Sequence, residues 1–176
     1  MSIFDARTAS SKRLFQPSVA RAIAAQLIQA VAFLHSRGVI HSQLHESNIL
    51  LKIPKSIDRL PSDKLYKEYG YPDQGDGVVP AWLWLACDEV SLDESEILLS
   101  DFGKSFISST TVRPHLHVPH ILRSPEQFFE PSRPLSFPAD IWALACAVFA
   151  ILGQRPLFNS TPCRLVEELA KSRLLL

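Results

Sequence analysis

The stretch His41-Ser-Gln-Leu-His-Glu-Ser-Asn48 decides the fold, because three further motifs follow it in a fixed order. Asp101-Phe-Gly103 ends a short apolar run, Ser124-Pro-Glu126 follows it, and Asp140-Ile-Trp142 opens a long apolar segment. Each motif alone is short enough to arise by chance. Three of the motifs lie at the border of a predicted helix or strand and Ser124-Pro-Glu126 lies in a predicted turn region, and four motifs in this order rise well above chance.

The residues before this stretch predict an amphipathic helix. Proline at position 17 and serine at 18 are typical of a helix start, and Gly38 is typical of a helix end. The apolar stripe has the 3.6-residue period of a helix; it consists of Val19, Ile23, Leu27, Val31 and Leu34.

A second helix is predicted over 140–152, and its apolar residues on nearly all sides place it at the centre of the domain. Short strand-like segments are predicted at 39–40, 48–51 and 97–99. Together these elements indicate an α+β fold that is mostly helical.

Residues 52–96 form a long polar insert with four prolines, and loops of this length are usually functional. Within the insert, the alternation of Trp82 and Trp84 predicts a strand that faces the core. The last segment, 162–176, is amphipathic and ends in three leucines, and we expect it to need a packing partner beyond the chain.

Composition excludes several classes of protein. The 176 residues, 47% of them hydrophobic and with zero formal net charge, suit one ordered domain and argue against disorder or a basic surface for nucleic acids. Three cysteines, Cys87, Cys146 and Cys163, are too few and too scattered for a disulfide framework, so we expect an intracellular protein of the cytoplasm or nucleus. The longest apolar run, 141–152, is too short to span a membrane.

In this order the four motifs resemble the C-terminal lobe of a eukaryotic protein kinase, with its catalytic loop H-R-D-L-x-x-x-N, its D-F-G and its A-P-E. The long insert before Asp101 and the stretches 136–142 and 155–158 are similar to the SR-protein kinase group of Ser/Thr kinases. The resemblance covers residues 18–158.

The resemblance implies a protein-kinase-like fold in which only the large, C-terminal lobe is present and the N-terminal lobe is absent. Residues 1–17 would be a lead-in, and 18–176 would be the lobe, incomplete at both ends. The insert 52–96 and an activation segment over 101–126 would belong to it. The short lead-in leaves no room for the glycine-rich loop and the phosphate-pairing lysine that hold ATP from above.

The resemblance also implies roles for individual residues, with ATP and Mg²⁺ as the cofactors of the family. Asp101 and Asn48 would each ligate a Mg²⁺ ion, and Phe102 and Gly103 would complete the nucleotide-binding motif. His41 would pack under Phe102. Three residues would be structural: Asp140 would accept hydrogen bonds from the loop backbone, Glu126 would anchor the end of the activation segment through an arginine beyond the chain, and Trp142 would belong to the core.

The catalytic loop departs from the family pattern at three positions. Gln43 stands where the family has the catalytic aspartate, and a neutral amide cannot act as a general base. Ser42 replaces the loop arginine, and His45 replaces the lysine that would touch the γ-phosphate. We therefore interpret the chain as a truncated pseudokinase that is inactive alone, and whether it retains Mg²⁺ and ATP stays open.

Several alternatives remain open at this stage. The chain is an active SR-protein-kinase-like enzyme if the N-terminal lobe is missing only from this sequence. It is a non-catalytic binding module if the insert and the large lobe hold a protein partner. A small-molecule phosphotransferase of the aminoglycoside or choline type has a similar loop, but it lacks the motifs at Ser124 and Asp140. Asp101 and Asn48 also have a purely structural interpretation, as a packing motif and a turn cap.

The expected partner is a protein, and it would be Arg-Ser-rich if it is a substrate. We expect no binding to nucleic acid or to a membrane, and the oligomeric state is open.

Overall fold

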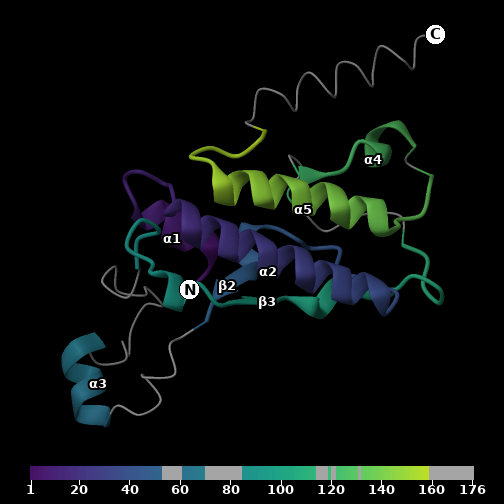
Figure 1. Cartoon of the computed structure of the whole chain (residues 1–176). Coiled ribbons are helices and arrows are strands. Elements are labelled where there is room, and N and C mark those ends of the chain that lie inside the picture. The colour runs from purple at the N-terminus through teal and green to yellow at the C-terminus, as the bar shows by residue number, and fades with distance from the viewer. Residues whose placement is uncertain (53–60, 70–84, 114–118, 120–121, 131, 159–176) are drawn as a thin grey trace.

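The computed structural model describes residues 1–52, 61–69, 85–113, 119, 122–130 and 132–158. Two long helices run side by side in opposite directions, and two short strand pairs flank them (Figure 1). The prediction of mixed helix and strand content is confirmed. The elements in chain order are α1 Ile3–Ala9, α2 Pro17–Ser36, β1 Val39–Ile40, η1 Glu46–Asn48, β2 Ile49–Leu51, α3 Ser62–Tyr69, η4 Leu92–Glu94, β3 Ile97–Leu99, η5 Phe102–Lys104, β4 Phe106–Ile107, α4 Glu126–Phe129 and α5 Phe137–Leu152.

Helix α2 follows the predicted pattern closely. Pro17 occupies its first turn, and Gly38 lies two residues past its end with a positive φ of 73°. Its length and composition alone would allow it to cross a membrane. Its apolar face is instead packed in the core and contacts α5, as in the core helix of a folded domain.

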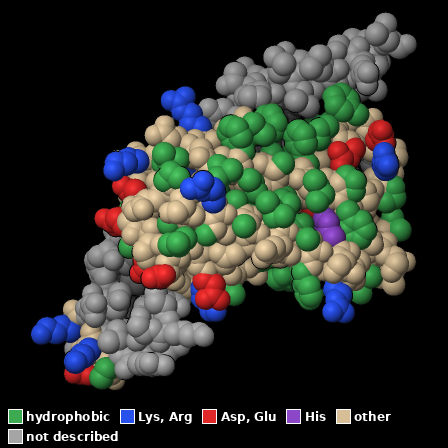
Figure 2. All heavy atoms as spheres, viewed as in Figure 1, with side chains coloured by type: hydrophobic (Ala, Val, Ile, Leu, Met, Phe, Trp, Pro, Cys, Tyr) green, Lys and Arg blue, Asp and Glu red, His purple; other side chains and the backbone are tan. Residues whose placement is uncertain are grey.

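Helix α5 begins three residues before the predicted start, with Ser136 preceding it and Pro138 in its first turn. The prediction that this helix lies at the centre of the domain does not hold for one of its faces. Ile141, Phe149 and Leu152 are 47–49% exposed, because α2 covers only the opposite face. Hydrophobic side chains accordingly form a broad band on the surface over α5 and α2 (Figure 2).

The two strand pairs bring the sequence motifs together. Strand β1 pairs antiparallel with β4, and β2 pairs antiparallel with β3. The loop 41–48 joins β1 to β2, and residues 100–105 join β3 to β4. Because the pairs hold both ends of both loops, 41–48 and 101–103 must lie against each other.

Residues 1–17 differ from the lead-in that the sequence predicts. Ser2 and Asp5 form a capping box at the start of α1, so a short helix forms there. Ile3, Ala6 and Phe15 are at most 2% exposed and belong to the main core. The first seventeen residues are therefore part of the folded domain.

The insert 52–96 is also more integrated than its polar sequence suggests. It contains α3, and near its C-terminal end Cys87 and Val90 are fully buried in the main core. The backbone N–H of Cys87 donates to the Ala6 carbonyl, which ties the insert to α1. The strand predicted at Trp82 and Trp84, and the segment 162–176, lie outside the described residues.

Candidate functional site

His41 links the two loops through its imidazole ring. The ring is fully buried and meets Phe102 edge-on, with 4.8 Å between centroids. Its Nε2 lies 3.0 Å from the Ser100 carbonyl, and its Nδ1 accepts a hydrogen bond from the Gln43 N–H. A carbonyl only accepts, so Nε2 carries the proton and the ring is the neutral tautomer. Burial lowers the pKa of His41, and the Ser100 carbonyl and the Asp140 and Asp101 charges oppose this only in part.

Asp140 fixes the backbone at the start of the loop. Its carboxylate accepts the N–H groups of His41 at 2.7 Å and Ser42 at 3.0 Å, and His35 Nε2 lies 3.2 Å away. The side chain is 1% exposed, so a charge is buried with three partners. The Asp140 side chain on α5 therefore holds the start of the loop 41–48 in place.

Ser42 makes a contact that the sequence did not predict. Its hydroxyl donates to the Lys104 carbonyl at 2.7 Å, and so joins the loop to the residues after Asp101-Phe-Gly103. Both Ser42 and Asp101 have left-handed backbones, with φ of 64° and 62°. Such conformations cost free energy for residues other than glycine and persist where the surroundings enforce them, which is typical of functional sites.

Asn48 lies at the point where both loops meet. Its side-chain nitrogen donates to the Gln43 carbonyl at 2.8 Å, and it lies 3.2 Å from His45 Nε2 and 3.5 Å from Asp101 Oδ2. The backbone carbonyl of Gln43 can only accept a hydrogen bond, so the Asn48 atom that faces it is the amide nitrogen. The other terminal atom of the Asn48 side chain is therefore Oδ1. No donor among the described residues reaches that oxygen.

The donor set suits a hard divalent cation. Asp101 offers an exposed carboxylate and Asn48 a free amide oxygen, and carboxylate and carbonyl oxygens are the ligands that Mg²⁺ prefers. Asn48 itself is only 9% exposed, so its position is fixed by the surrounding loop. A Cβ at Gly103 would make only ordinary contact with Asp101, so space alone does not demand glycine there.

A cavity of about 330 Å³ opens beside the loop. His45 and Ser47 line it on one side, and Arg7 and Leu157 lie among its other walls. Burial lowers the pKa of His45, and the nearby Asp101 charge opposes that shift. Burial also raises the pKa of Cys146, another wall residue, to about 11, so this thiol stays protonated near neutral pH.

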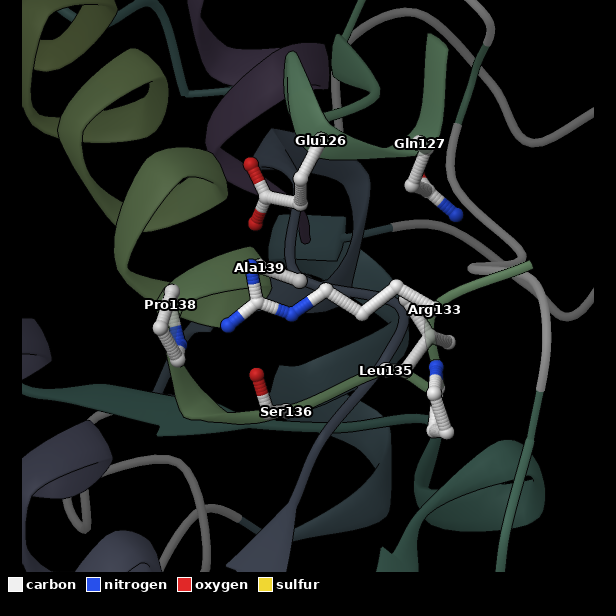
Figure 3. Close-up of a pocket in the computed structure, with 8 residues that line it drawn as sticks. Glu126, Gln127, Arg133, Leu135, Ser136, Pro138 and Ala139 are labelled. Atoms are coloured by element: carbon white, nitrogen blue, oxygen red, sulfur yellow. The ribbon is translucent and has the colours of Figure 1, made fainter. Parts of the chain in front are cut away.

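Glu126 and Trp142 belong to other parts of the domain. Glu126 lines a separate cavity of about 210 Å³, in which its carboxylate points toward the guanidinium group of Arg133 (Figure 3). Arg133 forms an ion pair with Glu130 at 2.9 Å. The Trp142 ring stacks on Phe158 with centroids 5.5 Å apart, as expected for a packing residue.

The sequence did not reveal the buried ion pair between Arg7 and Glu46. Arg7 Nη1 lies 2.7 Å from both carboxylate oxygens, and Nη2 donates to the Gly153 carbonyl. One side chain of α1 thus holds both η1 and the end of α5. Arg7 follows Ile3 by four residues and so lies on the same buried face of α1, but no sequence pattern relates it to Glu46.

Comparison with known proteins gives one family. Residues 2–173 match the family described as the protein kinase domain. The chain is 29% identical over 155 residues to the dual specificity protein kinase KNS1 of Saccharomyces cerevisiae, covering 86% of this chain and 19% of that protein. It is 28% identical over 141 residues to the dual specificity protein kinase lkh1 of Schizosaccharomyces pombe, covering 77% and 16%.

A plant relative gives the same result. The chain is 27% identical over 174 residues to the serine/threonine-protein kinase AFC2 of Arabidopsis thaliana, covering 90% of this chain and 33% of that protein. The chain therefore spans between about one-sixth and one-third of the length of these three relatives.

Proposed function

The chain belongs to the protein kinase family, and we propose that it keeps the residues that bind a Mg²⁺–nucleotide complex but has lost efficient phosphoryl transfer. The observation that carries this proposal is a contrast within one site. Asn48 and Asp101 are present and in contact, whereas Gln43 stands where a catalytic carboxylate is needed.

The binding half of the proposal rests on Asp101 and Asn48, which would hold the cation. A bound Mg²⁺ neutralises charge on the nucleotide phosphates. Asp140 and Ser42 keep the loop in the shape that brings these two ligands together, through buried hydrogen bonds to its backbone. His41 fixes the position of the Phe102 ring next to Asp101.

The catalytic half rests on Gln43. A general base must accept the proton of the attacking hydroxyl, and a carboxamide has no basic site near neutral pH. The loss of a general base costs about 10²–10⁴ in rate. The lysine that would contact the γ-phosphate is also replaced, by His45, whose lowered pKa keeps it neutral near pH 7. We therefore infer a pseudokinase.

We further propose that the described residues form the larger, mainly helical lobe of the kinase fold, in an SR-protein-kinase-like chain. The support is the order of the loop motifs between two long helices and the 52–96 insert before Asp101. The substrate or partner would then be a protein, Arg-Ser-rich in the SR-kinase interpretation. Intracellular location in the cytoplasm or nucleus is part of the same proposal.

A thermal melt of the purified chain with and without Mg²⁺ and ATP tests the binding half. A ligand at one hundred times its Kd adds about 2.7 kcal/mol of stability, which is a measurable shift of the melting temperature. We expect the shift in the wild type and in Asp93→Asn, an exposed carboxylate on η4 that serves as control. We expect no shift in Asp101→Asn.

Two other outcomes would redirect the proposal. A cooperative melt that Mg²⁺ and ATP leave unchanged would contradict nucleotide binding and favour the non-catalytic protein-binding module. A wild-type chain that phosphorylates an Arg-Ser-rich peptide at an ordinary kinase rate would contradict the pseudokinase half and favour an active enzyme.

A further inference from the structure

The side-chain amide of Asn48 has more acceptors around it than it has hydrogens. Its nitrogen carries two hydrogens, and one is committed to the Gln43 carbonyl at 2.8 Å. Two acceptors compete for the other, His45 Nε2 at 3.2 Å and Asp101 Oδ2 at 3.5 Å. The shorter distance gives the second hydrogen to His45.

This choice decides what Asp101 can do. If the amide donated to Asp101, a charge-assisted hydrogen bond would occupy a carboxylate oxygen that a cation needs. With His45 as the acceptor, Asp101 Oδ2 is left outside normal hydrogen-bond range, and the Asn48 oxygen has no donor among the described residues. Both ligand oxygens are then free for a cation.

We propose that His45 is a positioning residue of the cation site: its Nε2 accepts the second amide hydrogen of Asn48, so that this hydrogen does not occupy Asp101 Oδ2 and the carboxylate is left to bind the metal. The inference rests on the proposed binding of a divalent cation by Asn48 and Asp101. A lysine at this position has only donors and could not do this, because an ammonium group cannot accept from an amide nitrogen. A histidine at this position therefore supports a metal ligand, where the lysine of the family would contact the phosphate.

Two substitutions separate this role from general stability. His45→Gln keeps an acceptor oxygen near the place of Nε2, whereas His45→Leu is similar in bulk, uncharged and without an acceptor. Loss of a partner that orients a metal ligand costs about 10–100-fold in metal affinity. We expect His45→Leu to weaken Mn²⁺ binding by at least about tenfold, and we expect His45→Gln to bind Mn²⁺ nearly as the wild type does.

The measurement is titration of the full chain with Mn²⁺ alone, with free Mn²⁺ followed by electron paramagnetic resonance. Equal Mn²⁺ affinity in the wild type and His45→Leu would overturn the role of His45, while Asp101→Asn should abolish binding in the same assay. A wild-type chain that binds no Mn²⁺ would overturn the proposed cation site itself, and the role of His45 with it.

A second readout needs no metal. The inference requires Nε2 to be the bare nitrogen of the neutral ring, and ¹⁵N NMR of labelled histidine distinguishes a bare from a protonated ring nitrogen. We expect a bare Nε2 and a protonated Nδ1 for His45 in the folded chain. A protonated Nε2 in the neutral ring would overturn the inference even if Mn²⁺ binds, and would leave the proposed function standing.

Discussion

Asp140 shows how one side chain can set the shape of a loop far from it in sequence. Its carboxylate is almost fully buried and accepts two backbone N–H groups, those of His41 and Ser42, nearly one hundred residues earlier in the chain. Neither N–H group has another partner in the loop. The cost of removing this carboxylate is therefore the cost of leaving buried donors unpaired.

We expect Asp140→Ala to destabilise the domain by about 3–5 kcal/mol, because it leaves two buried N–H groups and His35 without their acceptor. Asp140→Asn keeps one carbonyl oxygen and should cost less. Urea denaturation followed by circular dichroism measures both. A change in Asp140→Ala below about 1 kcal/mol would show that the loop finds other partners.

His41 predicts a pH dependence of stability. Burial lowers its pKa in the folded chain below the ordinary value of 6.5, so the unfolded chain binds a proton that the folded chain resists. The unfolded state is then favoured as protons are added. We expect the free energy of unfolding to be at its full value above pH 6.5 and to fall as the pH drops below it.

NMR titration of the imidazole Cε1 proton measures this pKa directly. We expect a midpoint for His41 below 6.5 and a smaller loss of stability in acid for His41→Gln. The shift of His45 has the same sign and the same cause, so it contributes to the same loss. A His41 midpoint above 6.5 would show that the nearby Asp140 and Asp101 charges outweigh burial.

Gln43 allows a gain-of-function prediction. Gln43→Asp supplies the carboxylate that the loop lacks, and we expect the rate of peptide phosphorylation to rise by about 10²–10⁴ if the missing base is the main defect. Gln43→Glu is the matched control, because it adds the same charge on a side chain as long as glutamine. Rates of transfer from radiolabelled ATP to a serine peptide measure both. Unchanged rates in Gln43→Asp, with Mg²⁺ and ATP still bound, would place the defect elsewhere.

At the scale of elements, α1 is held to η1 by the Arg7–Glu46 pair. The two side chains are 8% and 15% exposed, so the pair is shielded from water more than an ordinary surface pair. We expect Arg7→Ala to destabilise the domain by up to about 3–5 kcal/mol, because Glu46 is left as a largely buried, unpaired charge.

The control for this pair lies just after the end of α4. Arg133 and Glu130 form an ion pair in which both side chains are more than half exposed, so Arg133→Ala should change stability by less than about 1 kcal/mol. The double variant Arg7→Met with Glu46→Leu should recover part of the loss, because neither charge is then left unpaired. A loss in Arg7→Ala no larger than in Arg133→Ala would contradict the structural role of the buried pair.

Local patterns in the sequence predicted the main elements because each signal is contained within the element itself. The period of the apolar residues and Pro17 predicted α2, and short apolar runs predicted β1, β2 and β3. Three of the four motifs also predicted residues that meet at the site, namely the stretch 41–48, Asp101 with Phe102, and Asp140, whereas Glu126 lines a separate cavity. The SR-kinase subgroup, the role of Gln43 and the binding of Mg²⁺ stay predictions.

What the sequence could not predict depends on contacts between distant residues. The hydrogen bond from Ser42 to Lys104 and the pair of Arg7 with Glu46 join residues that no local pattern relates. Helix α1 was missed because it is only seven residues long and its stability comes from burial against the core. The exposed face of α5 was missed because an apolar sequence shows what a helix is able to bury, not what covers it.

At the scale of the whole molecule, this exposed face is the feature with the clearest consequence. Ile141, Phe149 and Leu152 lie along α5 and are each about half exposed. On α2, Ile28 and Phe33 are also exposed, and Figure 2 shows a band of hydrophobic side chains over the two helices. The chain also carries no net charge that would keep copies apart.

We therefore expect the purified chain to self-associate through α5 as its concentration rises. Phe149→Gln and Leu152→Gln should each weaken association by roughly fivefold or more, since burying the exposed half of such a side chain is worth about 1 kcal/mol. Leu92→Gln is the control, because Leu92 is 55% exposed on η4, outside both long helices. Sedimentation velocity over a range of concentrations measures the association. A chain that stays monomeric throughout, or one whose association Leu92→Gln weakens as much as Phe149→Gln does, would show that the α5 face is not the contact surface.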